Sequence, residues 1–205
     1  MHVKICGITE CEDALGAVRL GVGALGFIFA PSPRRIAPEM ARFIISAIPP
    51  FIKTVGVFVN EKAAAIREYI NYCGLDLVQL HGDEPPDFCR KLMPHTIKAV
   101  RIKDESGLEM CAAYRASVRA LLLDTYAEDK AGGTGKTFDW QLAIKIREVG
   151  IPVILSGGLG PSNIAAAIST VRPYAVDVNS GVEKGPGKKS YALMKELMEK
   201  VRGTE

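Results

Sequence analysis

The chain has 205 residues, of which 48% are hydrophobic and 24% are charged, a composition typical of a soluble globular protein with a sizeable core. The formal charge is +3, and the two short basic clusters, Arg34-Arg35 and Lys188-Lys189, are too little for a nucleic-acid-binding face. The longest apolar run, residues 22–30, is too short to span a bilayer, and no signal peptide opens the chain. We therefore expect neither nucleic-acid nor membrane partners.

Five cysteines give an odd number, and their spacing fits neither a disulfide framework nor a zinc site. These residues are Cys6, Cys11, Cys73, Cys89 and Cys111. We expect reduced thiols and a cytoplasmic location.

The first apolar run begins at Val3 and predicts a short buried strand that ends at Cys6. Thr9 and Glu12 follow with the spacing of a reciprocal capping box, so we expect a helix to start at Thr9. A thiol at a strand end is held rigidly where a loop opens. It suits a reactive group, and it equally suits an inert packing cysteine.

Short apolar runs rich in β-branched residues recur along the whole chain and alternate with segments of helical period. The runs start near Val3, Leu25, Thr54, Asp76, Ile97, Arg119, Pro152 and Tyr174. Most are almost continuously apolar, as in residues 120–123, which is typical of parallel strands covered by helices on both sides.

Eight such units predict an α/β fold, a single-domain (β/α)8 barrel of the TIM type spanning residues 1–205. An open doubly wound sheet is the alternative, but no strand is followed by the G-x-G-x-x-G pattern of dinucleotide-binding folds. In both architectures, functional groups gather at the carboxyl ends of the strands.

Two of these ends carry complementary chemistry. Cys6 ends the first strand, and Asp124 directly follows three leucines at the end of the sixth. We expect a cation or helix N-terminus to lower the pKa of the thiol, giving an acid–base pair with the partly desolvated carboxyl. The alternatives are a packing role for Cys6 and a loop-capping role for Asp124.

Glycine-rich loops follow the seventh and eighth strands, at residues 156–161 and 179–183. Backbone N–H groups in such loops can approach a phosphate, and this barrel recurrently binds phosphate there. Two turns without a ligand are the alternative interpretation.

Two other loops are longer than the repeat requires. One, residues 30–35, follows the second strand, and the other, residues 126–137, follows the sixth and indicates a mobile lid. The second contains the glycine-rich stretch Gly132 to Thr137, which is similar to a P-loop, but Lys130 stands where a P-loop needs glycine. Trp140 is expected at the start of the next helix.

The three histidines do not predict a metal site. His81 ends the fourth strand and faces the mouth, where it either lines the pocket or makes structural hydrogen bonds. His2 and His95 precede strands and belong to the opposite face. Asp177 ends the eighth strand and is expected to line the mouth or orient a loop.

Six motifs occur together and in order. They are Lys4-Ile5-Cys6-Gly7-Ile8-Thr9, Gln79-Leu80-His81-Gly82, Leu122-Leu123-Asp124-Thr125, Gly133 to Trp140, Ser156-Gly157-Gly158-Leu159 and Asp177 to Glu183. On these motifs the whole chain resembles the phosphoribosylanthranilate isomerases of tryptophan biosynthesis.

The resemblance implies an Amadori rearrangement of N-(5-phosphoribosyl)anthranilate, with Cys6 as general base and Asp124 as general acid. It implies no cofactor, because the imine of the substrate is the electron sink. Arg35 would hold the anthranilate carboxylate, with its neighbour Arg34 as the alternative if the alignment slips by one residue.

The remaining implied contacts to the phosphorylated small-molecule substrate come from strand ends and loops. The expected phosphate-binding residues are Gly157, Gly158, Ser180 and Gly181. His81 and Asp177 complete the expected pocket. The chain is expected to be a monomer or a homodimer, and Phe51 either docks such a dimer or packs locally.

Rival functions are another phosphosugar isomerase or epimerase on the same barrel, and a non-catalytic phosphate-ligand barrel. The first would need paired catalytic aspartates or metal ligands and would leave Cys6 idle. The second would bind substrate without turnover.

Overall fold

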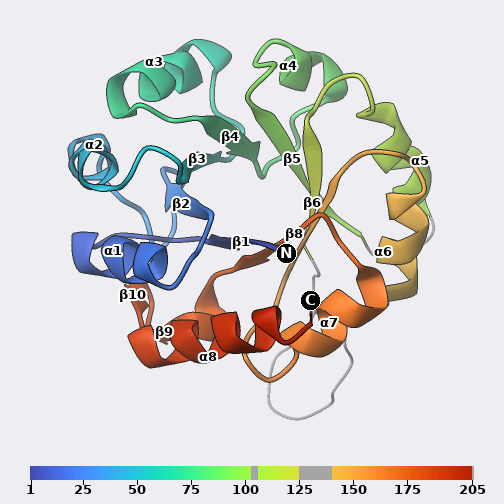
Figure 1. Cartoon of the computed structure of the whole chain (residues 1–205). Helices are drawn as coiled ribbons and strands as arrows, with labels where there is room; N and C mark the ends of the chain where they lie inside the picture. The colour runs from blue at the N-terminus through green and yellow to red at the C-terminus, as the bar shows by residue number, and fades with distance from the viewer. Residues whose placement is uncertain (103–105, 125–139, 205) are drawn as a thin grey trace.

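The computed structural model describes residues 1–102, 106–124 and 140–204. Eight parallel strands form one closed barrel in sequence order, and helices surround it (Figure 1). The strands are β1 (His2–Ile5), β2 (Ala24–Ile28), β3 (Lys53–Phe58), β4 (Leu77–Leu80), β5 (Thr96–Arg101), β6 (Ala120–Asp124), β7 (Val153–Ser156) and β8 (Ala175–Val178). The predicted barrel and its strand positions are confirmed.

A helix follows each strand of the barrel, and a small hairpin lies before the last helix. The helices are α1 (Cys11–Arg19), α2 (Pro38–Ala47), α3 (Ala63–Cys73), α4 (Pro86–Arg90), α5 (Ser106–Ala113), α6 (Trp140–Arg147), α7 (Ile164–Val171) and α8 (Tyr191–Arg202). The 3-10 turn η1 (Ser180–Val182) leads into the hairpin of β9 (Glu183–Gly185) and β10 (Lys188–Lys189).

The predicted helix start at Thr9 is wrong. Helix α1 begins at Cys11, after Glu10 as N-cap residue, and Glu10 makes no side-chain capping bond. The Thr9 hydroxyl instead donates to the backbone carbonyl of Gly187 in the β9–β10 hairpin. The Thr9 hydroxyl therefore bonds to a residue near the other end of the chain, whereas the local pattern predicted that it caps the helix.

The strands are apolar along their length because both faces are buried. One face points into the barrel and the other packs against the helices. In β6, Leu121 and Leu123 belong to the outer core, whereas Ala120 and Leu122 belong to the barrel interior. The interior cluster comprises Val55, Ile97, Ala99, Ala120, Leu122, Ile154 and Ala175.

The pairing of β1 with β8 closes the barrel, with Cα partners from His2↔Ala175 to Ile5↔Val178. This register places Lys4 directly opposite Asp177. The two buried side chains form an ion pair of 2.9 Å between Lys4 Nζ and Asp177 Oδ1. A charged pair thus lies among otherwise apolar side chains.

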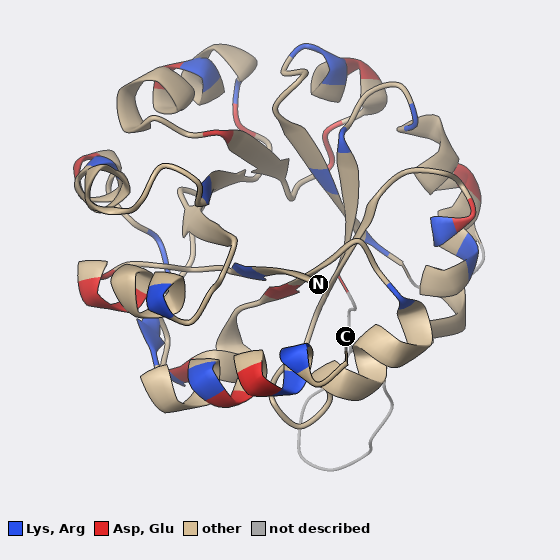
Figure 2. Cartoon of the chain, in the orientation of Figure 1, with Lys and Arg blue, Asp and Glu red and all other residues tan. Residues whose placement is uncertain are grey.

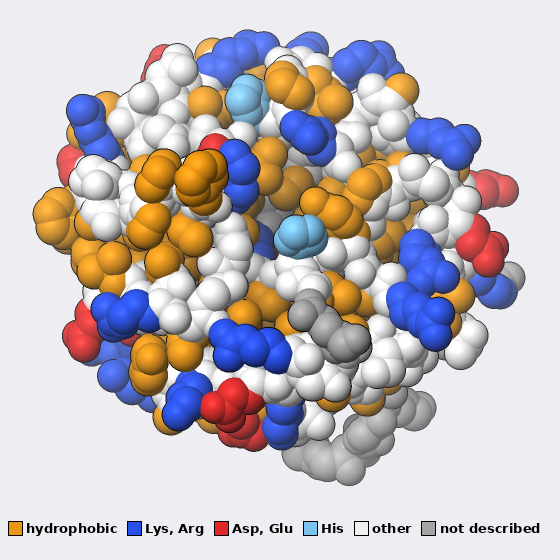
Figure 3. Space-filling view, viewed as in Figure 1, with side chains coloured by type: hydrophobic (Ala, Val, Ile, Leu, Met, Phe, Trp, Pro, Cys, Tyr) orange, Lys and Arg blue, Asp and Glu red, His pale blue; other side chains and the backbone are white. Residues whose placement is uncertain are grey.

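The outer surface mixes charges of both signs. Figure 2 shows Lys and Arg interspersed with Asp and Glu along the helices, and Figure 3 shows hydrophobic side chains among them on the face where the chain starts. Phe51 is 93% exposed. In the described ranges, no helix is long and apolar enough to cross a bilayer.

The expected lid, residues 126–137, lies outside the described residues. Helix α6 does begin at Trp140, as predicted, and this side chain packs against the outer core.

Candidate active site

A cavity of about 220 Å³ opens at the carboxyl ends of the strands. Its lining combines strand ends with the loops that follow them, where this fold places functional groups. The lining residues are Cys6, Ile28, Val57, Gln79, His81, Asp124, Ser156, Gly157, Gly158, Leu159, Asp177, Asn179 and Ser180. Cys6 and Asp124, predicted from distant parts of the sequence, therefore face one cavity.

Cys6 directly follows β1, and its backbone N–H extends the barrel pairing by donating to the carbonyl of Val178. Its side chain is buried, at 4% exposure. Burial raises the pKa of the thiol above its ordinary value of 9.0, although the positive charge of Lys4 opposes this. The expectation of a lowered pKa is wrong, because loss of hydration outweighs the nearby cation.

Asp124 is joined to His81 and Gln79 in a chain of hydrogen bonds. Gln79 Nε2 lies 3.0 Å from His81 Nδ1, and His81 Nε2 lies 3.0 Å from Asp124 Oδ2. An amide nitrogen can only donate, so His81 Nδ1 is the acceptor and the ring proton of a neutral His81 resides on Nε2. His81 Nε2–H then donates to the Oδ2 atom of Asp124.

Gln79 is a functional candidate that the sequence did not single out. It is 1% exposed, and its Oε1 has no hydrogen-bond partner among the described residues. A buried glutamine with one unused oxygen is costly in an apolar barrel. A functional role accounts for this cost: the hydrogen bond from Gln79 to His81 fixes the orientation of the imidazole ring.

The two glycine loops meet at the cavity, as expected, but they contribute unequally. Gly157, Gly158 and Ser180 line it. Gly181 instead packs against the preceding loop, where an added Cβ would overlap the Leu159 carbonyl. Gly181 therefore brings the two loops together.

Arg34, and not Arg35, lies beside the Cys6 loop. A Cβ on Gly7, which has φ of +72°, would lie 2.7 Å from Asn179 Oδ1 and 2.9 Å from Arg34 Cδ, so this position needs glycine. Arg35 is exposed. Of the two arginines weighed from the sequence, Arg34 therefore lies beside the Cys6 loop and Arg35 does not, and the contact of either with a substrate carboxylate stays a prediction.

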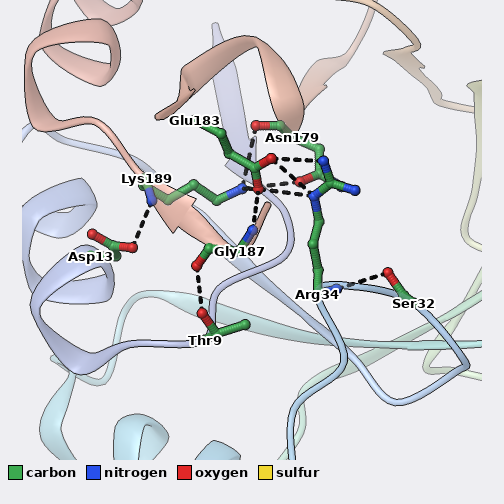
Figure 4. A network of polar contacts seen from close by, with 8 residues as sticks. All are labelled: Thr9, Asp13, Ser32, Arg34, Asn179, Glu183, Gly187 and Lys189. Atoms are coloured by element: carbon green, nitrogen blue, oxygen red, sulfur yellow. Dashed lines mark hydrogen bonds and ion pairs between the residues drawn. The ribbon is translucent and has the colours of Figure 1, made fainter. Parts of the chain in front are cut away.

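Glu183 holds Arg34 in this position (Figure 4). Arg34 Nε and Nη2 both donate to the Glu183 carboxylate, with the Nη2–Oε2 distance at 2.7 Å. On the other side of the carboxylate, Lys189 Nζ lies 2.8 Å from Oε1 and also donates to Asn179 Oδ1. The network ties the loop after β2 to the loop after β8.

Lys189 belongs to the short basic cluster Lys188-Lys189 that the sequence shows. In the structure it is 1% exposed, because the β9–β10 hairpin turns it inward toward Glu183. The sequence does contain a signal for this network: Glu183 and Lys189 have opposite charges and flank a turn at Gly187.

A metal site is not formed by the described residues: they contain no group of three or more His, Cys, Asp or Glu that could hold an ion. His81 lines the cavity, as expected, whereas His95 lies elsewhere and bonds through Nδ1 to the Asp76 carbonyl.

The tautomer of His81 can be measured directly. In neutral rings, ¹⁵N–¹H correlation spectra should show the proton of His81 on Nε2 and that of His95 on Nδ1, because a carbonyl can only accept. His95 is the internal control, and His81→Asn assigns the signals. A proton on Nδ1 of neutral His81 would contradict the chain of donors.

Glu183→Gln tests the arginine network through stability. Burial alone would raise the Glu183 pKa, but hydrogen bonds from Arg34 and Lys189 hold it below its ordinary value of 4.5. Its contribution is therefore present above pH 4.5 and is lost as the pH falls through the lower folded-state pKa.

The variant should lose about 3–5 kcal/mol of unfolding free energy at neutral pH, and the difference from wild type should narrow in acid. Urea unfolding at both pH values measures this. Glu199→Gln, on the exposed face of α8, is the control and should change stability by less than about 0.5 kcal/mol. If the difference in unfolding free energy between Glu183→Gln and wild type were the same at both pH values, the ion pairs of Glu183 would not be its cause.

Comparison with known proteins shows the family of the chain. The family model described as N-(5'phosphoribosyl)anthranilate (PRA) isomerase matches residues 3–200. A Geobacter sulfurreducens protein named N-(5'-phosphoribosyl)anthranilate isomerase is 51% identical over 204 residues, covering 99% of each chain.

Solved structures give the same result. The phosphoribosyl anthranilate isomerase of Thermotoga maritima is 47% identical, with a TM-score of 0.92 over 99% of each chain. Another, in complex with reduced 1-(o-carboxyphenylamino)-1-deoxyribulose 5-phosphate, is 44% identical with a TM-score of 0.89, again over 99% of each chain. The chain belongs to the N-(5'-phosphoribosyl)anthranilate isomerase family.

Proposed function

We propose that the chain catalyses the Amadori rearrangement of N-(5-phosphoribosyl)anthranilate to 1-(2-carboxyphenylamino)-1-deoxyribulose 5-phosphate, in tryptophan biosynthesis. The observation that carries the assignment is the joint exposure of Cys6 and Asp124 to one cavity, which glycine loops also line. A base and an acid on one substrate are what proton transfer between carbon and oxygen needs.

In the first step, protonated Asp124 donates its proton to the ring oxygen of the ribose. The C1–O bond breaks, its electron pair stays on oxygen, and the nitrogen lone pair forms a protonated Schiff base. His81 Nε2 lies 3.0 Å from Asp124 Oδ2 and keeps the carboxyl oriented.

In the second step, the Cys6 thiolate removes the proton from C2. The electron pair of that C–H bond forms the C1=C2 double bond of an enolamine and neutralises the iminium nitrogen. Tautomerisation of the enol to the ketone completes the isomerisation. The imine of the substrate accepts the electrons throughout, so these steps need no cofactor.

Substrate contacts follow from charge and backbone. Gly157, Gly158 and Ser180 offer the phosphate a loop surface. Arg34 is the proposed partner of the anthranilate carboxylate. Its Nε and Nη2 atoms bind Glu183, which fixes the plane of the guanidinium group and leaves the Nη1 side for the substrate. The relative solved with a reduced product analogue binds a ligand with the same two anionic groups.

All eight strands belong to one closed sheet, so the chain is proposed to work as one domain. It is proposed to act in the cytoplasm as a monomer or homodimer. A relative from Thermotoga maritima is described as dimeric, and Phe51 offers an exposed aromatic ring for such a contact.

The direct test generates phosphoribosylanthranilate in situ and follows the loss of its anthranilate fluorescence. Cys6→Ser and Asp124→Asn should each lower kcat by about 10²–10⁴-fold without unfolding the barrel. Cys11→Ser, a nearby thiol at the start of α1, is the matched control and should stay close to wild type. Near-wild-type turnover in Cys6→Ser or Asp124→Asn would remove that residue from the mechanism, and binding without turnover in the wild type would favour a ligand-binding barrel.

The carboxylate contact is tested with Arg34→Lys, which keeps the charge and loses the planar fork. It should raise KM by about tenfold, since one charged hydrogen bond contributes about 1.5–3 kcal/mol, while kcat changes little. Arg35→Lys is the control at the neighbouring exposed position. A large KM effect at Arg35 with none at Arg34 would reverse the assignment.

A further inference from the structure

We propose that Lys4 is a positioning residue for the isomerisation, and that its buried ammonium group is the counter-ion of the Cys6 thiolate. This rests on the proposed role of Cys6 as the base. The inference follows from where Lys4 lies, from what else it contacts, and from a comparison with a second buried lysine.

Lys4 and Cys6 lie two residues apart on the same side of the β1 segment, and both side chains crowd the same point of β2. An ideal Cβ on Gly26 would lie 2.7 Å from Cys6 Sγ and 3.1 Å from Lys4 Cε. The thiol and the end of the lysine chain therefore occupy adjacent space over Gly26, inside the barrel.

Burying this lysine is costly. Its side chain is 4% exposed, and Asp177, at 5%, is its ion-pair partner. A buried pair often stabilises a protein no more than apolar side chains of the same volume would, so stability alone does not account for it. The positive charge of Lys4 would, however, stabilise a thiolate that forms at the neighbouring Cys6.

The pair formed by Lys98 and Glu84 provides the contrast. Its side chains are equally buried, at 4% and 3%, and its Nζ–Oε2 distance is also 2.9 Å. Lys98, however, also donates to the carbonyls of Leu80 and Gly82, and so ties down the backbone after β4. Lys98 thus has a structural task, whereas Lys4 faces a reactive thiol.

Among the residues that the structure describes, four charged groups act on Cys6 from the surrounding elements: Lys4 on β1, Asp177 on β8, Lys189 on β10 and Arg34 in the loop after β2. Burial is the largest influence and raises the thiol pKa. The charge of Lys4 is the strongest influence in the opposite direction, and it outweighs the raising effect of Asp177. Lys4 is thus the main local support of the thiolate.

The test measures the thiolate without any substrate, and so its outcome is separate from that of the proposed function. Iodoacetamide forms an S–C bond with the thiolate and releases iodide, and peptide mass spectrometry reports the rate at Cys6 across a pH series. Cys11 in the same samples is the internal reference.

Lys4→Met should slow alkylation of Cys6 about tenfold at a fixed pH, which corresponds to a shift of one pKa unit, and should move the alkylation profile to higher pH. Lys98→Met is the matched control, and should leave the Cys6 rate unchanged. Lys4→Arg, which restores the charge, should recover most of the rate. In the isomerase assay, the loss in Lys4→Met should fall on kcat and not on KM.

A wild-type rate at Cys6 in Lys4→Met, or an equal loss in Lys98→Met, would overturn the proposal. If Lys4→Met does not fold, Lys4→Met/Asp177→Asn removes both charges and keeps the volume. Because the Cys6 thiol and the end of the Lys4 side chain both lie against Gly26, loss of the lysine charge should still make Cys6 alkylation slower than wild type in this double variant, and an unchanged rate would again overturn the proposal.

Discussion

The pairing of β1 with β8 is the interaction on which the site depends. It closes the sheet, sets Lys4 against Asp177, and continues through the backbone bond from Cys6 to Val178. One register thus decides both where the thiol lies and which charges surround it. Because side chains alternate along a strand, a shift by one residue would turn Lys4 toward the helices and leave Asp177 buried without its partner.

The two groups that transfer protons meet the cavity in different surroundings. Burial raises the pKa of the Cys6 thiol, and the positive charge of Lys4 opposes that rise. Asp124 instead lies against His81, whose ring is oriented by Gln79. The reaction needs a thiolate at Cys6 and a proton on Asp124, so Lys4 and the pairing of His81 with Gln79 are the groups that support these two roles.

The barrel was predictable because strands buried on both faces leave a long apolar signal, as in residues 120–123. Cys6 and Asp124 were predictable as strand ends. The start of α1 was not, since the Thr9 hydroxyl finds its partner at Gly187, far along the chain. Arg34 and Arg35 are adjacent and chemically identical, so only their contacts separate them. The burial of Lys4 in an ion pair with Asp177, and the raised pKa of Cys6, both depend on how distant strands pack, which no local sequence pattern contains.

The assignment of Asp124 as general acid and Cys6 as general base is tested most directly by isotope effects in single-turnover reactions with substrate deuterated at C2. If Cys6 removes that proton, Cys6→Ser makes its removal rate-limiting and enlarges the isotope effect. If Asp124 opens the ring, Asp124→Asn makes the earlier step limiting and suppresses the isotope effect. An enlarged effect in Asp124→Asn together with a suppressed one in Cys6→Ser would contradict the assignment of base and acid.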